Sequence, residues 1–176
     1  MLGEQFDKVA IVLSTGRTAT KAIAHYFDTW YPEVVARHEP FPSRPLRFGS
    51  NLYLADRISR RNLKSLIVLC RKASLARTQA SIYLEANFYL HGCMEALDEV
   101  FRDVRVCHIV RHPGRQVTSY INFGVFRGLK GAVGRHVPYW LLKPENCDSD
   151  PIQRWNDMSE RERLAWRWNV MNTELN

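Results

Sequence analysis

The chain has 176 residues, of which 45% are hydrophobic and 24% charged, and its formal net charge is +7 at pH 7. This balance excludes a disordered chain, and no apolar run approaches the roughly 18 residues that a membrane span needs. The length suits a single domain over residues 1–176 with a sizeable core. The excess of arginine and lysine favours a partner rich in phosphate or sulfate. Because no nucleic-acid-binding signature accompanies it, we expect that partner not to be a nucleic acid.

The N-terminus and the cysteines indicate the cellular compartment. The first ten residues lack the apolar segment and small-residue cleavage site of a signal peptide, so we expect a cytoplasmic protein. The widely spaced cysteines, which form no CxxC pair, are Cys70, Cys93, Cys107 and Cys147. Because Cys93 and Cys107 fall on apolar faces, buried reduced thiols are favoured over disulfides or a metal site.

The first half of the chain begins with a strand and a helix. Residues 9–15 form a short apolar run, which is typical of a buried strand, and apolar residues at helical spacing predict a helix over 18–30. Three prolines within 34–48 predict an extended or looped segment. Residues 51–72 are predicted to begin as a helix, whereas 66–70 fits a helix or a strand.

The middle of the chain continues the alternation of strands and helices. Strands are predicted over 81–85 and 104–110, the second of them buried, and a helix over 113–123 with Pro113 at a favoured first position. An amphipathic helix is predicted between the two strands, with an apolar stripe formed by Leu90, Cys93, Met94, Leu97, Val100 and Phe101. This alternation predicts a three-layer α/β fold with a parallel sheet covered by helices on both faces.

The C-terminal part of the chain is predicted to be a basic loop followed by a helix. Glycines punctuate residues 124–136, and we expect a mobile basic loop there, either closed over an anionic ligand or simply solvated. Asp150 before Pro151 is typical of a helix cap, and Ser159 with Glu162 fits a capping box. The helix that follows has an apolar face formed by Leu164, Trp168, Met171 and Leu175.

The first candidate site follows the first strand directly. A loop between a strand and a helix presents backbone N–H groups at a helix N-terminus, where phosphate or sulfate binds well. Its residues are Ser14, Thr15, Gly16, Arg17, Thr18, Ala19, Thr20 and Lys21. In the alternative interpretation, the hydroxyls cap the helix and the two cations are solvated. A Walker phosphate loop is excluded, because the second glycine is missing and Lys21 is followed by Ala22.

The second candidate site is formed by Arg111 and Ser119. Arg111 follows the strand predicted over 104–110, at the carboxyl edge where ligands bind in open α/β sheets. Ser119 lies eight residues later, in the predicted helix. A guanidinium and a hydroxyl in this arrangement can bind one phosphate group. An arginine paired with an acidic residue and a solvated serine is the alternative.

Together the two sites resemble the PAPS-dependent sulfotransferase superfamily, where PAPS is 3′-phosphoadenosine 5′-phosphosulfate. Its members carry a basic-Ser-Gly-Thr-Thr or basic-Ser-Gly-Ser-Ser loop after the first strand, and Arg17-Thr18-Ala19-Thr20 occupies that place here. They also carry an Arg followed by Asn/Asp-Pro and, eight residues after the Arg, by a Ser. This spacing is matched by Arg111, His112-Pro113 and Ser119.

Three further segments are similar to the carbohydrate, tyrosylprotein or bacterial members of this superfamily. They are His38-Glu39-Pro40, the stretch Tyr83–Asn87 and the stretch Ala165–Asn169. The resemblance implies a P-loop NTPase-like sulfotransferase fold. It also implies that the chain lacks the C-terminal part of the family fold, because family members continue past the last helix.

The resemblance implies transfer of a sulfonate group from PAPS to a hydroxyl or amine acceptor by in-line displacement, without a metal. Residues 14–21 would bind the 5′-phosphosulfate, with Arg17 as the main catalytic cation, and Arg111 with Ser119 would bind the 3′-phosphate. Glu39 is the first candidate for the general base, Glu85 the second and His38 the third. The identity of the acceptor, which can be a small molecule, carbohydrate or peptide, stays open.

Two other functions stay open. One is a nucleotide-dependent small-molecule kinase with a degenerate phosphate loop, which would require Mg²⁺ and an acidic ligand at a strand end. The other is a non-catalytic module that binds an anionic partner or PAP, the desulfonated product of PAPS.

Overall fold

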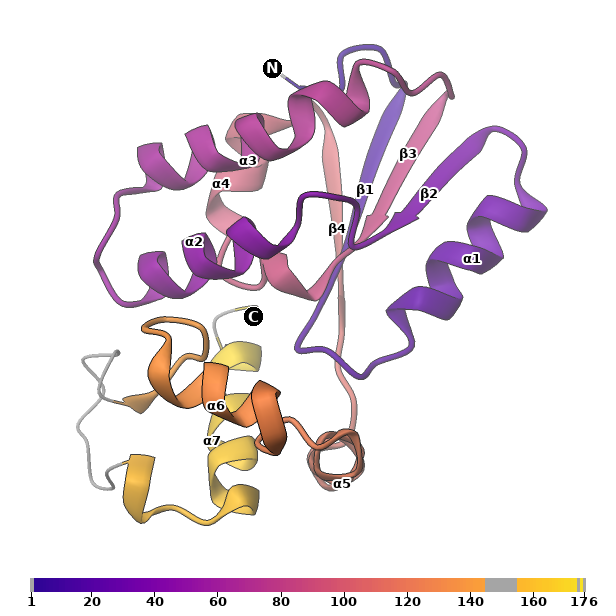
Figure 1. The fold of residues 1–176 in the computed structure, drawn as a ribbon. Helices are drawn as coiled ribbons and strands as arrows, with labels where there is room; N and C mark the ends of the chain where they lie inside the picture. Colours follow the sequence, from indigo (N-terminus) through magenta and orange to yellow (C-terminus); the bar gives the residue numbers. More distant parts are fainter. Residues whose placement is uncertain (1, 145–154, 174, 176) are drawn as a thin grey trace.

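A computed structural model describes residues 2–144, 155–173 and 175. It is an α/β protein with a four-stranded, all-parallel sheet in the order β2-β3-β1-β4 (Figure 1). The strands are β1 (Lys8–Ser14), β2 (Val34–His38), β3 (Ile82–Ala86) and β4 (Val104–Ile109). The helices are α1 (Thr20–Trp30), α2 (Arg44–Leu54), α3 (Arg60–Leu75), α4 (Met94–Val100), α5 (Pro113–Phe123), α6 (Gly128–His136) and α7 (Glu160–Thr173), with 3-10 turns at Phe88–Leu90 and Trp155–Asp157.

Helices cover both faces of the sheet, as predicted. Side chains alternate between the two faces along a strand. Val12 of β1 therefore packs toward α1 with Ala24 and Leu84, whereas Ile11 and Leu13 face the opposite side. On that side α2, α3 and α4 contribute the larger part of the core, including Leu46, Leu63, Ile67, Ala96 and Leu97 (Figure 1).

The order of the strands creates a switch point between β1 and β3. The chain leaves β1 through α1 on one face of the sheet, and it leaves β3 through α4 on the other face. Open α/β sheets bind ligands at such points, beside the carboxyl ends of the strands. Helix α5 follows the carboxyl end of β4, and α7 packs against α5 (Figure 1).

Several predicted elements are confirmed. The predicted elements at 9–15, 18–30, 81–85 and 113–123 correspond to β1, α1, β3 and α5 with bounds that agree within two residues. The capping box at the start of α7 is also present: the Ser159 N–H donates to Glu162 Oε2 at 2.7 Å, and the Glu162 N–H donates to Ser159 Oγ at 3.3 Å. Asp150, Pro151 and Cys147 lie outside the described residues.

The structure corrects or decides three further segments. Residues 34–38 are extended, as predicted, and form β2, whereas residues 44–48 begin α2, because Pro45 occupies the first turn of a helix, where no backbone N–H is needed. Residues 66–70, for which helix and strand were both open, are helical, within α3. Residues 124–136 are not only a loop, since 128–136 form α6 despite three glycines.

Strand β4 is less buried than predicted. It lies at the edge of the sheet, and its residues alternate between half-buried and exposed. Cys107 on this strand is therefore exposed, whereas Cys70 and Cys93 are buried free thiols as expected. Within the described part of the chain, no helix is both long and apolar enough to cross a membrane.

A buried ion pair connects α3 to the end of β3. Arg71 Nε and Nη2 donate to the two carboxylate oxygens of Glu85 at 2.8 and 2.7 Å, and each side chain is only 1% exposed. The Tyr83 hydroxyl and Asn87 Nδ2 also donate to Glu85, at 2.8 and 2.7 Å. Arg71 further donates to the Pro42 carbonyl at 3.1 Å. The pair thus fixes the segment between β2 and α2 to the sheet.

Replacing one partner of this pair should strongly destabilise the fold. In Arg71→Met the Glu85 carboxylate stays buried without its cation, so we expect a loss of about 3–5 kcal/mol in the free energy of unfolding. Urea denaturation at pH 7 measures this loss. Arg61→Met, an exposed position on the same helix, is the control and should change stability by less than about 0.5 kcal/mol. A loss in Arg71→Met as small as that of the control would contradict the assignment.

Candidate functional site

A cavity of about 1080 Å³ opens at the carboxyl edge of the sheet. This volume lies at the upper end of the range of about 300–1,000 Å³ that is usual for small-molecule sites. Both sequence-predicted motifs contribute to its wall, as do residues of α2, α6 and α7. From the first motif, all the predicted residues except Ser14 line it, and Arg111 and Ser119 line it from the second.

The loop after β1 has an unusual backbone. Gly16, Arg17 and Ala19 all have left-handed conformations, with φ of 83°, 57° and 64°. Left-handed residues at a helix N-terminus are a feature of backbone anion sites, because they turn successive N–H groups toward one side. Within the described residues, the Thr18 hydroxyl is buried and has no hydrogen-bond partner. The loop thus combines backbone donors with an unused hydroxyl, as an oxyanion site requires.

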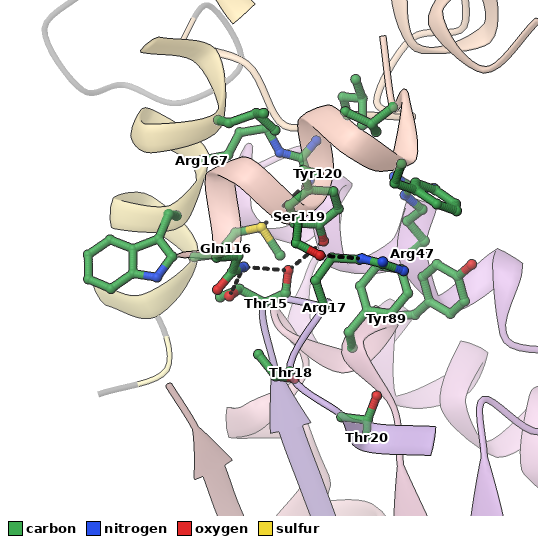
Figure 2. A pocket seen from close by; sticks show the side chains of 18 of the residues that line it. Thr15, Arg17, Thr18, Thr20, Arg47, Tyr89, Gln116, Ser119, Tyr120 and Arg167 are labelled. Carbon is green, nitrogen blue, oxygen red and sulfur yellow. Dashed lines mark hydrogen bonds between the residues drawn. The ribbon is translucent and has the colours of Figure 1, made fainter. Parts of the chain in front are cut away.

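Helix α5 binds this loop through one face (Figure 2). Gln116 Nε2 donates to the Thr15 carbonyl at 3.2 Å and to the Thr15 hydroxyl at 2.6 Å, and the Tyr120 hydroxyl donates to the same carbonyl at 2.8 Å. Ser119 Oγ accepts from Arg17 Nε at 3.1 Å (Figure 2). Positions 119 and 120 come three and four residues after 116, so both are neighbours of 116 on the helix surface. A single helical face therefore determines the conformation of the loop.

Arg111 connects the same loop to α7. Arg111 Nη1 donates to the Arg17 carbonyl at 2.8 Å, and the Arg111 carbonyl accepts from Trp168 Nε1 at 2.9 Å. The Arg17 guanidinium lies 4.9 Å from the centre of the Phe123 ring. The structure thus brings Arg17, Arg111 and Ser119 together, although the two motifs are far apart in the sequence.

Positive charge is in excess around the cavity. The cationic side chains that line it are Arg17, Lys21, Arg44, Arg47, Arg111 and Arg167. Among the lining residues, Glu39 is the only carboxylate. None of these cations forms an ion pair with any residue that the structure describes. A ligand with several anionic groups would supply the missing countercharge.

Burial lowers the pKa of two cations of the cavity, Arg47 and Arg167. Desolvation, followed by the positive charge of Arg47, lowers the pKa of Arg167 to about 10. Desolvation also lowers the pKa of Arg47, against the opposing effects of Tyr89, Tyr120 and Glu39. Both arginines stay protonated at pH 7, so each contributes a full charge in a partly dehydrated site, where charge interactions are stronger than in water.

Two of the three candidate bases lie at the cavity. Glu39 lines it, and burial raises the pKa of its carboxyl group although the charge of Arg47 opposes this shift. His38 Nε2 lies 3.3 Å from Glu39 Oε1 and 3.2 Å from the Thr20 hydroxyl. Burial and then the charge of Lys21 lower the pKa of His38. Glu39 and His38 are therefore close enough to exchange a proton.

Glu85 does not line the cavity, which disagrees with its prediction as the second candidate base. Its carboxylate is buried in the pair with Arg71 and accepts hydrogen bonds from Tyr83 and Asn87 as well. A carboxylate with both oxygens so engaged stabilises the fold and has no access to a substrate proton. The position of Glu85 at a strand end was correct, but its side chain points into the core.

Sequence reasoning missed several residues of the cavity. They are Arg44, Arg47, Tyr89, Gln116, Tyr120, Trp140 and Arg167. A signal existed for Gln116 and Tyr120, because they share a helical face with Ser119. No comparable signal pointed to Arg47 or Arg167, which reach the cavity only through the packing of α2 and α7.

Comparisons with protein-family models, with curated proteins and with solved structures find no match to this chain. The case for a function therefore depends on the residues of the cavity and their geometry.

Gly16 should be essential for the conformation of the loop. A Cβ at this position would overlap the Tyr120 hydroxyl, and φ of 83° disfavours any L side chain. Gly16→Ala should therefore lower the free energy of unfolding by about 2 kcal/mol or more. Adding Tyr120→Phe should recover part of this loss, because it removes the overlap but not the strained φ. Urea denaturation measures both effects.

Gly114→Ala is the matched control for this experiment. Gly114 lies in α5, where a Cβ would meet only the His112 ring at 3.4 Å. This variant should be neutral or slightly stabilising, because alanine favours a helix more than glycine does. Equal stability of Gly16→Ala and Gly114→Ala would show that the left-handed loop is not constrained as described.

Proposed function

We propose that the chain is a sulfotransferase with a P-loop NTPase-like fold that uses PAPS as its sulfonate donor. The observation that supports this most is the direct contact between the two motifs: Arg17 and Ser119 are 102 positions apart in the chain, and their side chains are hydrogen-bonded at one cavity. A donor with anionic groups at both its 5′ and 3′ positions requires two such anion sites side by side. The excess of cations and the volume of the cavity suit this donor.

The backbone of the loop supports the same proposal. The superfamily that the sequence resembles has glycine at the third position of its loop motif, where this chain has Ala19. Ala19 has φ of 64°, a conformation that glycine adopts without strain. Local strain of this kind persists where the surrounding structure enforces it, commonly at functional sites. A left-handed residue at the position of the family glycine supports the proposal, despite the different residue.

PAPS, when bound, supplies the sulfonate group, which passes to an acceptor oxygen or nitrogen as the bond between sulfur and the bridging oxygen of the 5′-phosphate breaks. In the proposal, Arg17 and Lys21 stabilise the negative charge that develops on that oxygen and on the sulfonate oxygens. The hydroxyls of Thr18 and Thr20 and the loop N–H groups donate hydrogen bonds to the same charge. Preorganised donors of this kind usually provide the largest share of catalysis.

The remaining residues of the proposal bind the donor or accept the proton. Arg111 and Ser119 bind the 3′-phosphate, once the Arg17 side chain turns from Ser119 toward the 5′ end. Glu39 takes the proton of the acceptor hydroxyl, and its buried position makes it a stronger base than an exposed carboxylate. His38, in contact with both Glu39 and Thr20, is placed to pass that proton onward.

Nucleotide binding tests the donor assignment. PAP should bind with micromolar affinity, and Arg111→Ala should lower this affinity by about 30-fold or more, as expected for the loss of a charge-assisted hydrogen-bonded pair. The same substitution should lower the affinity for AMP, which has no 3′-phosphate, much less. Isothermal calorimetry of the wild-type chain and the variant measures both ligands. Ser119→Ala should act in the same direction with a smaller effect.

Arg115→Ala is the control, since Arg115 is an exposed residue of α5 that does not line the cavity. It should bind PAP as the wild type does. Mg²⁺-dependent binding of ATP without binding of PAP would contradict the proposal and favour a kinase. PAP binding without any sulfonate transfer from PAPS to a panel of phenols, sugars and amines would indicate a non-catalytic binding module.

The pH dependence of transfer tests Glu39. A base acts when deprotonated, so the rate should rise with pH through the pKa of Glu39, which lies above 4.5 because burial disfavours the charged form. The charge of Arg47 lowers this pKa. Arg47→Gln should therefore move the rising limb of the pH–rate profile to higher pH. A limb that persists in Glu39→Gln would exclude Glu39 as the base.

A further inference from the structure

The cavity contains a second group of cations, which helices contribute and the loop after β1 does not. Arg47 comes from α2 and Arg167 from α7, and we call these two residues the distal arginine pair. The Arg47 guanidinium lies 4.6 Å from the centre of the Trp140 ring and 5.7 Å from that of Tyr89. Its position is therefore set by aromatic contacts, and its N–H groups at the edge of the guanidinium plane are left for other partners.

The distal arginine pair makes few hydrogen bonds. A guanidinium has five N–H donors. Within the described residues, Arg167 donates only to Met171 Sδ at 3.6 Å, a weak acceptor, and Arg47 has no hydrogen bond. Neither residue has a nitrogen among the buried atoms without a partner, so their unused donors are not sealed inside the protein. Both residues line the cavity, so their unused N–H donors are accessible from it.

The distal arginine pair also lacks ion-pair partners among the residues that the structure describes. Charged side chains removed from water are normally paired with an opposite charge. Glu39 is the only carboxylate among the described residues that line the cavity, and it forms no ion pair with either arginine. The donor proposed above has its own cations in Arg17, Lys21 and Arg111. Three lining cations, Arg44, Arg47 and Arg167, have no role in the donor proposal, and the distal arginine pair is two of these three.

We propose that the acceptor of the sulfonate group is itself an anion, and that the distal arginine pair binds its carboxylate or other oxyanion. This inference rests on the function proposed above. The planar guanidinium of each arginine suits the two oxygens of a carboxylate, and the walls formed by Val133 and Leu141 suit an apolar or ring portion of the acceptor. The acceptor hydroxyl then lies toward Glu39, the proposed base.

Two matched pairs of probes test this proposal. The first is 4-hydroxyphenylacetate with its neutral amide, and the second is glucuronate with glucuronamide. Calorimetry with PAP-saturated protein keeps the donor cations occupied, so it reports the remaining site. We expect the carboxylate to bind at least about tenfold more tightly than the amide in one pair or both, as a charge-assisted hydrogen bond implies. No preference in either pair would overturn the proposal.

Substitutions locate the preference on the distal arginine pair. Arg167→Gln and Arg47→Gln should each reduce the preference to less than about threefold, and Arg167→Lys should retain part of it. Arg161→Gln removes the same charge from the exposed side of the same helix and should keep the full preference. A preference that is unchanged in both Arg167→Gln and Arg47→Gln would overturn the proposal.

The two proposals can fail separately. Removal of Arg167, a half-buried charge without a countercharge, should not lower the melting temperature, which thermal unfolding verifies for each variant. PAP binding by the wild type and by Arg167→Gln tests the donor site alone. If PAP does not bind, the sulfotransferase proposal is wrong. The carboxylate preference, repeated without PAP, then still decides whether the distal arginine pair is an anion site.

Discussion

The contact between α5 and the loop after β1 is the constraint on which the cavity depends. The loop contains three left-handed residues, two of them with a side chain, and such a backbone does not persist without external support. Gln116 and Tyr120 supply that support at the single residue Thr15. The same docking brings Arg111 to the Arg17 carbonyl. The candidate anion site is therefore a tertiary structure made by two segments, and not a property of either segment alone.

The cavity concentrates charge that the rest of the structure must tolerate. Several cations face it without ion-pair partners among the described residues, and mutual repulsion lowers the stability of the folded chain. The opposite arrangement is found in the interior between α3 and β3, where Arg71 forms a buried ion pair with Glu85. The pair of Arg71 and Glu85 also binds the segment that leads into α2. The buried ion pair thus helps to position cations that have no ion-pair partner among the described residues, including Arg47.

Local patterns predicted the elements with clear periodicity, and tertiary packing determined the rest. The apolar run of β1 and the proline at the start of α5 were sufficient to place both motifs at the edge of the sheet. The helical end of residues 34–48 was predicted wrongly because the same prolines suit a loop or the first turn of a helix. The sequence does not show how α2 and α3 pack. For this reason, neither the position of Arg47 at the cavity nor the partner of Glu85 could be predicted. A strand end identifies an edge of the sheet, but it does not tell which face receives the side chain.

The long separation between the two halves of the anion site affects how the protein is made. Thr15 and Gln116 are 101 positions apart, and closing so long a loop is slow compared with forming one helix. A nascent chain that has emerged only as far as β3 already contains every residue of the first loop. It does not yet contain the side chains of α5 that give this loop its shape. The newly synthesised protein therefore acquires the conformation of this loop late, when α5 docks, and not when the loop leaves the ribosome.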